Sequence, residues 1–348
     1  MLENLKLELE NIKDFSEVLN MAAHQVEDYK KFVSVAKVKN GEPLAFLGEM
    51  DDLGTAGAGC NPEYKEVGIV NKLKRWELGD WSVATKMCYQ VLENTYGEYL
   101  LKTGTDKADA AEFMAKVYIP KFVEQLTKAM WRFGWFGDKD AKNITSGGQI
   151  TDGVDTSMFT VCDGLFKQIF AICAENAEQV TEIAANKKTT FAEQKSAMLA
   201  KGVATGIVDK VLMDADPRIS ASAGSMLMMT KAMADALAYD IKQSHNVIMP
   251  WTTVFEGFDV AEYNGVKVAR ISIWDRLIKA YENDGTKLNK PYRVVYASPE
   301  NLAFGSDAND VVSEASLYFD ERTRENLVFA QGKFGAMVKE DELIHAAY

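Results

Sequence analysis

The residues best suited to hold a metal ion lie together in the stretch GDKDAKNITSGGQ. Asp138, Asp140 and Asn143 are oxygen donors close in sequence, as calcium ligands often are. A calcium-binding EF-hand loop starting at Asp138 also needs an acidic or amide residue at its fifth position, glycine at its sixth and glutamate at its twelfth. Those positions hold Lys142, Asn143 and Gln149. The spacing therefore argues against calcium and predicts a solvated turn whose leading glycine ends a helix.

Two glycine-rich stretches could cradle a phosphate group, as glycine-rich loops do in nucleotide-binding proteins. The first, GAGCNP, places Pro62 where a dinucleotide-binding fingerprint needs its third glycine for close helix packing. The second, GVATG, is not followed by the lysine and the serine or threonine of a phosphate-binding loop. Neither stretch predicts a cofactor, and we expect none.

Side chains that could act as nucleophiles or metal ligands are scattered along the chain. They are His24, His245, His345, Cys60, Cys88, Cys162 and Cys173. They form no zinc-binding or C-x-x-C spacing, and no G-x-S-x-G nucleophile motif is present. No catalytic residue and no metal ligand is predicted, although a fold could still bring distant residues into one site.

An aromatic run precedes the acidic turn. Trp131, Phe133, Trp135 and Phe136 fall within the stretch WRFGWF. Such rings could stack on a base or a flavin, but aromatic residues at helical spacing are more often core or interface anchors. The run is therefore interpreted as the end of a long helix that packs against a sheet or against a neighbouring subunit.

The overall composition limits the class of protein. The chain has 348 residues, with 51 acidic against 39 basic side chains and a formal charge of −12. This acidity argues against a broad basic face that grips DNA phosphates. The N-terminus lacks a signal-peptide pattern, and no stretch approaches the run of about 20 apolar residues that spans a bilayer. We expect a soluble cytoplasmic protein with reduced thiols and no membrane partner.

The elements that must position these residues alternate between helix and strand, which predicts an α+β fold. In the first half, apolar periodicity predicts helices over 2–35, 81–102 and 106–136, the last kinked at Pro120. Residues 38–80 form a predicted two-stranded excursion with a glycine-rich tip. Such an excursion buries little core of its own, so we expect another surface to cover it.

The second half of the chain alternates helices and strands. CDGLFKQIFAICAENAEQVTEIA and KGVATGIVDKVLMDADPRI predict helices, GSMLMMT a buried strand and KAMADALAYDIKQS the helix after it. FDVAEYNGVKVARISI predicts a hairpin that turns at Asn264 and Gly265. YRVVYAS predicts another strand, and residues 310–348 predict extended strands.

The order of these parts, more than any one motif, resembles the major capsid protein of tailed bacteriophages over nearly the whole chain. IVDKVLMDADPRISASAGSMLMMTKAMADAL is similar to the family's helix, arginine-containing turn, buried strand and following helix. The hairpin of the family is resembled by FEGFDVAEYNGVKV. The strand pair that follows this hairpin in the family is resembled by YRVVYASPENLAFGSD. FDERTRENLVFAQGKFGAMVKEDELIHA resembles its closing strands, and FGDKDA the turn after its spine helix.

The resemblance implies a division of the chain into five parts. These are an N-terminal arm (1–37), an extended loop that is a long β-hairpin (38–80), a peripheral domain with a spine helix (81–148), an axial α/β domain (149–309) and C-terminal strands that return to the peripheral domain (310–348).

The resemblance also implies a structural role without catalysis. Many copies would form hexamers and pentamers and close an icosahedral shell around double-stranded DNA, bound without sequence specificity. The shell would be a virion capsid assembled in the host bacterial cytoplasm, with portal and scaffolding proteins as partners. The implied subunit contacts are Gly54, Gly57, Gly59, Tyr64, Lys65, Glu66, Arg75, Glu77, Trp131, Trp135, Asp138, Arg322, Arg324 and Glu325.

Two departures from the family limit what carries over. Only residues 1–37 precede the loop, so scaffolding is expected to be a separate protein. No loop lysine can be matched to a partner asparagine, so no covalent cross-link is predicted. Two other readings stay open: an encapsulin, which shares the fold but holds a protein cargo, and a cytoplasmic α/β enzyme whose site is built from distant residues.

Overall fold

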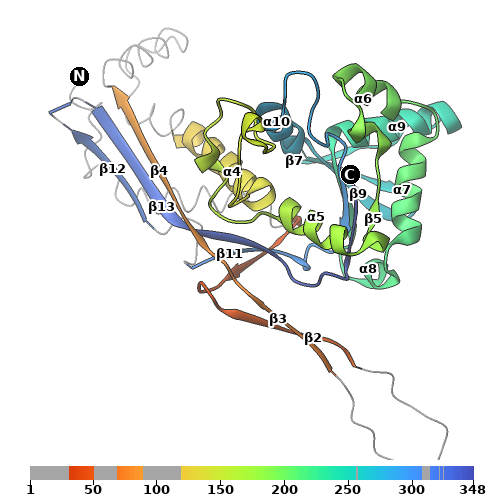
Figure 1. Ribbon diagram of the computed structural model, residues 1–348, viewed down its shortest axis with the longest axis horizontal. Coiled ribbons are helices and arrows are strands. Elements are labelled where there is room, and N and C mark those ends of the chain that lie inside the picture. Colours follow the sequence, from red (N-terminus) through yellow and green to blue (C-terminus); the bar gives the residue numbers. More distant parts are fainter. Residues whose placement is uncertain are drawn as a thin grey trace, which may run out of the picture.

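The computed structural model describes residues 31–50, 69–88, 119–255, 258–307, 314–320, 322–323 and 325–348. Figure 1 shows a compact lobe of helices around a sheet, a long sheet that extends away from it, and a thin hairpin that projects from both. Most of the predicted N-terminal helix, the tip of the predicted loop and the first part of the predicted spine helix lie outside the described residues.

The compact lobe is built on a mixed seven-stranded sheet. Its strand order is β5, β14, β10, β6, β9, β8 and β7. The pairs β6–β9 and β5–β14 are parallel, and the other neighbours are antiparallel. The strands are Val180–Thr181 (β5), Met226–Thr230 (β6), Thr252–Phe255 (β7), Phe258–Tyr263 (β8), Val266–Ile271 (β9), Val294–Ala297 (β10) and Ile344–Ala347 (β14).

Two helical layers cover the two faces of this sheet. Side chains alternate along β6, so Met228 packs into one hydrophobic cluster, whereas Leu227 and Met229 pack into another. The first cluster includes side chains of α4, α5 and α10, and the second those of α6, α7, α8 and α9. These helices are Ile119–Phe136 (α4), Leu165–Glu175 (α5), Phe191–Met198 (α6), Val203–Asp214 (α7), Pro217–Ala221 (α8), Lys231–His245 (α9) and Ser272–Tyr281 (α10).

One long strand organises the second sheet. β13 (Glu325–Val338) pairs antiparallel with β4 (Gly79–Cys88), with β12 (Glu314–Asp320) and with β11 (Leu302–Ser306). β1 (Ser34–Lys37) adds to β11 in parallel. Figure 1 shows β13 running from the far end of this sheet to the compact lobe, so one strand connects the two parts.

The projecting hairpin has a sheet of its own. β2 (Pro43–Met50) and β3 (Ile69–Arg75) pair antiparallel, and Pro43 lies opposite Arg75 at the base. At this base, Val38, Trp76 and Leu78 form a small hydrophobic cluster with residues of β11 and β13. The hairpin is therefore anchored where it leaves the long sheet.

The aromatic run ends α4, which packs on the long sheet. At Gly134 a side-chain Cβ would lie 2.3 Å from the ring of Phe304 on β11, and at Gly137 it would lie 2.4 Å from the carbonyl oxygen of Cys162. No other amino acid fits such close approaches without displacing its neighbours. The two glycines therefore let the helix end sit directly on its surroundings.

One buried ion pair lies where α4, α5, α10 and β10 meet. Arg293, which is 1% exposed, donates from Nη2 to Glu282 and to the Asn289 carbonyl oxygen at 3.0 Å. Three phenylalanine rings lie 4.7 to 5.6 Å from the guanidinium group; they are Phe136, Phe166 and Phe170. The charge is thus both paired and stacked on aromatic faces, which makes its burial tolerable.

Several predicted elements are confirmed. GSMLMMT contains β6, and KAMADALAYDIKQS forms α9. The predicted hairpin is β8–β9, and it turns at Asn264 and Gly265 with φ values of 49° and 79°. Both residues thus adopt the left-handed conformation that a type I′ turn requires. YRVVYAS contains β10.

Other predicted elements differ from the structure. Residues 81–88 belong to strand β4, although a helix was predicted there. Residues 34–35, predicted as the end of the N-terminal helix, are the first residues of strand β1. Pairing of β4 with β13 outweighs the local helical pattern, because strand stability depends on partners distant in sequence. At the end of the chain, residues 344–347 form β14 in the seven-stranded sheet.

Replacing Arg293 with methionine should destabilise the fold by about 3–5 kcal/mol, because Glu282 is then left buried without a counter-charge. Urea unfolding of the purified subunit, followed by tryptophan fluorescence below the concentration at which particles form, measures this loss. The double variant R293M/E282L removes both charges and should recover much of the stability. A double variant as unstable as R293M would contradict the assigned role of the pair.

Candidate assembly surfaces

The hairpin stem is fixed to the body of the protein by one lysine. Lys74 on β3 donates from Nζ to the Val338 carbonyl oxygen at 2.7 Å and forms an ion pair with Asp341 at 2.5 Å. These acceptors lie at the end of β13 and just after it, so the stem is tied to the long sheet. Leu73, the neighbour of this lysine, is 59% exposed. The hairpin thus combines a fixed base with an apolar side chain in solvent.

The predicted contact residues of the loop fall into two groups. The first group lies outside the described residues; it comprises Gly54, Gly57, Gly59 and Tyr64 of the tip and Lys65 and Glu66 of the stem. In the stem, Arg75 is exposed and donates from Nη1 to the Gly41 carbonyl oxygen at 3.3 Å. Glu77 forms an ion pair with Lys139, and this hydrogen bond raises the pKa of the lysine. The stem residues therefore contact their own chain.

Trp131 and Trp135 do not lie on the surface of the subunit. They are 1% and 0% exposed. Trp135 lies 4.5 Å from the ring of Trp274, and Trp131 lies 5.1 Å from the ring of Phe258. Their interpretation as contacts with another subunit is therefore corrected: they anchor α4 in the core of their own chain. Helical spacing identified the rings as anchors, but it could not show which surface they pack on.

Asp138 belongs to a cluster of three carboxylates centred on Lys167. The Lys167 Nζ atom lies 2.6 Å from Asp138, 2.9 Å from Asp140 and 2.8 Å from Asp163. The first two carboxylates lie in the turn after α4, whereas Lys167 belongs to α5. The ammonium group therefore holds this turn against α5. The predicted solvated turn is stabilised by an ion-pair network.

The pKa values in this cluster are coupled. Partial burial opposes the charge on Lys167, but hydrogen bonds to Asp138, Asp163 and Asp140 outweigh it and raise the pKa of the lysine. The hydrogen bond and the positive charge of Lys167 in turn lower the pKa of Asp140. The ion pair between Lys167 and Asp140 is therefore charged near neutral pH.

The predicted contacts of the closing segment lie around the start of β13. Arg322 is exposed, and its backbone N–H donates to the Asp320 carboxylate at 2.9 Å in a turn. Glu325 forms an ion pair of 3.1 Å with Lys86 across the β13–β4 pair. Arg324 lies outside the described residues. The side chain of Arg322 therefore stays available at the surface, whereas Glu325 is engaged within its own sheet.

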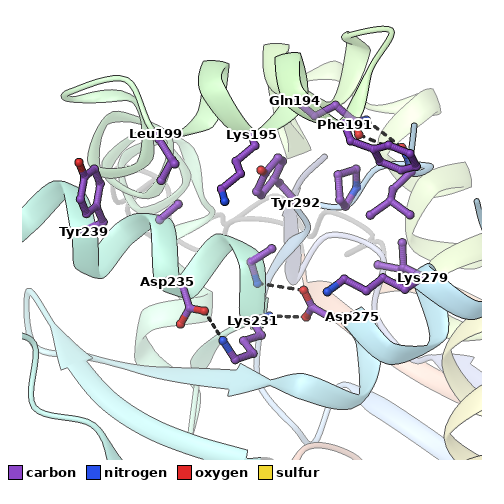
Figure 2. A pocket seen from close by; sticks show the side chains of 15 residues that line it. Phe191, Gln194, Lys195, Leu199, Lys231, Asp235, Tyr239, Asp275, Lys279 and Tyr292 are labelled. Carbon is purple, nitrogen blue, oxygen red and sulfur yellow. Dashed lines mark hydrogen bonds and ion pairs between the residues drawn. The ribbon is translucent and has the colours of Figure 1, made fainter. Parts of the chain in front are cut away.

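A cavity of about 650 Å³ lies between α6, α9 and α10 (Figure 2). Apolar and aromatic side chains make up most of its walls; they include Phe191, Leu199, Tyr239, Ile278, Leu288 and Tyr292. Asp275 lies in the floor and accepts the backbone N–H groups of Lys231 and Ala232 at 2.5 and 2.9 Å. Burial raises the pKa of Asp275. Sequence reasoning missed this cavity because its lining residues come from separate elements without a shared motif.

Two buried thiols lack the properties of catalytic nucleophiles. Burial raises the pKa of Cys162 to about 12 and that of Cys173 to about 11, so both stay protonated near neutral pH. Across the described ranges, no group of three or more His, Cys, Asp and Glu side chains could hold a metal ion. None of the helices within those ranges is long and apolar enough to cross a membrane.

Replacing Lys167 with methionine should destabilise the protein most near neutral pH, because three carboxylates then face one another without a counter-charge. In the wild type, the pKa of Asp140 is lower in the folded protein than in the unfolded chain. The charged carboxylate therefore stabilises the fold at pH values above its unfolded-state pKa, and this stabilisation is lost as the pH falls through the folded-state pKa. The difference between the urea midpoints of wild type and K167M should therefore be largest at pH 7 and shrink below about pH 4.

The matched control for this variant is K142M, which removes an exposed lysine of the same turn that forms no ion pair with another described residue. Its midpoint should stay close to that of the wild type. A difference between wild type and K167M that remains constant from pH 7 to pH 3 would show that lost packing, not lost charge, explains the effect.

Comparison by sequence finds no relative: no protein-family model matches the chain, and neither does any curated protein. Solved structures do match. A chain in the procapsid of satellite phage P4, which includes the size determination (Sid) protein, is similar over 95% of this chain and 98% of its own length, with a TM-score of 0.52 and 9% identity.

Two further matches are a structure from Mycobacterium phage Ogopogo and an encapsulin. The phage structure covers 92% of this chain and 90% of its own, with a TM-score of 0.51 and 11% identity. The holo-SrpI encapsulin from Synechococcus elongatus is similar over 91% of this chain and 85% of its own length, with 9% identity and a TM-score of 0.46. The chain therefore has the α+β fold predicted from its sequence, that of tailed-phage major capsid proteins.

Proposed function

We propose that this chain is the major capsid protein of a tailed phage, and that many copies assemble as hexamers and pentamers into an icosahedral shell around double-stranded DNA. The observation that carries this proposal is the likeness to a chain of the satellite phage P4 procapsid along 95% of the present chain. Because one fold can serve several functions, the surfaces of the subunit must also suit assembly.

The β2–β3 hairpin suits assembly. A two-stranded hairpin is at best marginally stable alone in water. This one leaves Leu73 59% exposed. A neighbouring copy that covers the hairpin would bury apolar surface that one chain leaves in solvent. We assign this role to the loop 38–80, with its tip 54–64 as the main contact and Arg322 as a contact of the closing segment.

The other predicted parts receive matching roles. Residues 1–37 form the arm, 81–148 the peripheral domain and 149–309 the axial domain. Residues 310–348 return to the peripheral domain through β12 and β13, and β14 then completes the axial sheet. In this assignment the seven-stranded sheet belongs to the axial domain, and the long sheet belongs mainly to the peripheral domain but also includes β11 from the range 149–309.

The proposed partners follow from the negative charge of the chain and from its proposed role as a capsid protein. A formal charge of −12 suits a container that must release packed DNA and needs no recognition groove. Portal and separate scaffolding proteins complete the assembly of the virion capsid in the host cytoplasm. The chain acts as a structural protein and not as an enzyme.

Electron microscopy of the purified, expressed protein tests the shell. Closed particles or curved sheets are expected over some range of salt and pH, because weak contacts between subunits depend on screening. Small discrete oligomers at every salt and pH would contradict the proposal. Nucleic acid inside native particles is the expected content, whereas a protein cargo would indicate an encapsulin instead.

Deleting residues 54–64 should leave the subunit folded but unable to form stable shells. The glycine-rich sequence of the tip is not expected to bury a core of its own, so the thermal midpoint of the unassembled subunit should change by only a few degrees, as expected for a change of about 1 kcal/mol or less. Particle yield measured by sedimentation should fall sharply. Particles as robust as those of the wild type would remove the loop from the set of subunit contacts.

A further inference from the structure

The cavity between α6, α9 and α10 is built to receive an apolar side chain beside a negative charge. Two ammonium groups approach it: Lys195 lies in the last turn of α6 and Lys279 in the last turn of α10 (Figure 2). Neither lysine forms an ion pair with another residue that the structure describes. Lys231, the third lysine of the wall, is instead paired with Asp235. The cavity therefore combines apolar walls with two lysines that form no ion pair among the described residues, beside the carboxylates of Asp235 and Asp275.

The same chain carries a matching pair of side chains at the end of α7. Met213 is 81% exposed, the largest value among the exposed large apolar side chains of the described residues. Asp214 follows it directly, is also exposed, and ends the helix. Methionine adapts to irregular apolar cavities and makes favourable contacts with aromatic rings such as that of Tyr239.

The Asp214 carboxylate lies in an unfavourable position within its own subunit. The C-terminal end of a helix carries partial negative charge, and an acidic side chain there is repelled by it. No basic residue lies in the last turn of α7. Positive charges from another molecule would relieve this repulsion, which makes the end of α7 a surface that favours a basic partner.

The cavity and the end of α7 lie on opposite sides of the compact lobe. Figure 1 shows α6, α9 and α10 along one side, whereas α7 runs across the lobe and ends beside α8 on the other. Two different surfaces on opposite sides of one chain make a heterologous contact, in which each copy donates to the next. Such a contact closes into a ring when the rotation between copies permits it.

We propose that Met213 and Asp214 of one copy enter the cavity of the next copy. Met213 packs against Leu199 and Tyr239, and Asp214 pairs with Lys195 and Lys279. This inference rests on the proposed shell function, because it assigns a specific contact within the hexamers and pentamers. A cavity of about 650 Å³ falls in the range that holds a drug-sized ligand, so it has room for the two side chains.

A disulfide test reads this contact directly. In assembled particles of M213C/Y239C, oxidation should link neighbouring copies, and a non-reducing gel should show a ladder that ends in closed rings of five and six copies. The single variants and M213C/V254C are the controls. Val254 is 43% exposed but lies on β7, outside the lining of the cavity. Normal particles in which M213C/Y239C cross-links no more than these controls would overturn the contact.

A charge reversal provides a second test, which holds even if the cysteine variants assemble poorly. D214K should lower particle yield at least about tenfold, because like charges then meet at the interface. K195D/K279D should do the same, and the combination of all three substitutions should restore assembly. Wild-type yields in every variant would overturn the contact but leave the shell function intact. Absence of particles from the wild type at every salt and pH would instead overturn the shell function itself.

Discussion

The buried ion pair between Arg293 and Glu282 is the contact at which the elements of the compact lobe converge. Arg293 precedes β10 and Glu282 follows α10, while Phe136 of α4 and Phe166 of α5 stack on the guanidinium group. A charge this deeply buried is tolerated only when its partner and its aromatic neighbours are all in place. The pair therefore joins the end of α4, α5 and α10 to the central sheet at one point.

From this junction the structure extends outward through β13. This strand holds β4 and β12 at its distal half and β11 at its proximal half, so it joins the long sheet to the lobe. The Val338 carbonyl oxygen at its end accepts the hydrogen bond that anchors Lys74 of the hairpin. The direction of the hairpin is thus set by the same strand that positions the sheet. The long sheet thus supports the β2–β3 hairpin, which has only a small hydrophobic cluster at its base.

The sequence predicted the elements whose signals are local. The continuous apolar run of β6 and the Asn264–Gly265 turn are examples, because each signal depends only on neighbouring residues. β4 was missed because its partner β13 lies far along the chain, and local periodicity over 81–88 imitates a helix. The same limit applies to surfaces. Spacing marked Trp131 and Trp135 as anchors, but only the fold shows that they face their own core, and no motif links the elements that form the cavity.

The contrast between the interior and the surface of this subunit points to assembly. The interior is closely packed, and both Trp135 and Trp274 are 0% exposed. The surface, by contrast, keeps features that cost free energy in a single chain, namely the apolar Leu73 on a thin hairpin and the Asp214 carboxylate at the negative end of α7. Contacts with neighbouring copies that cover these features would relieve both costs.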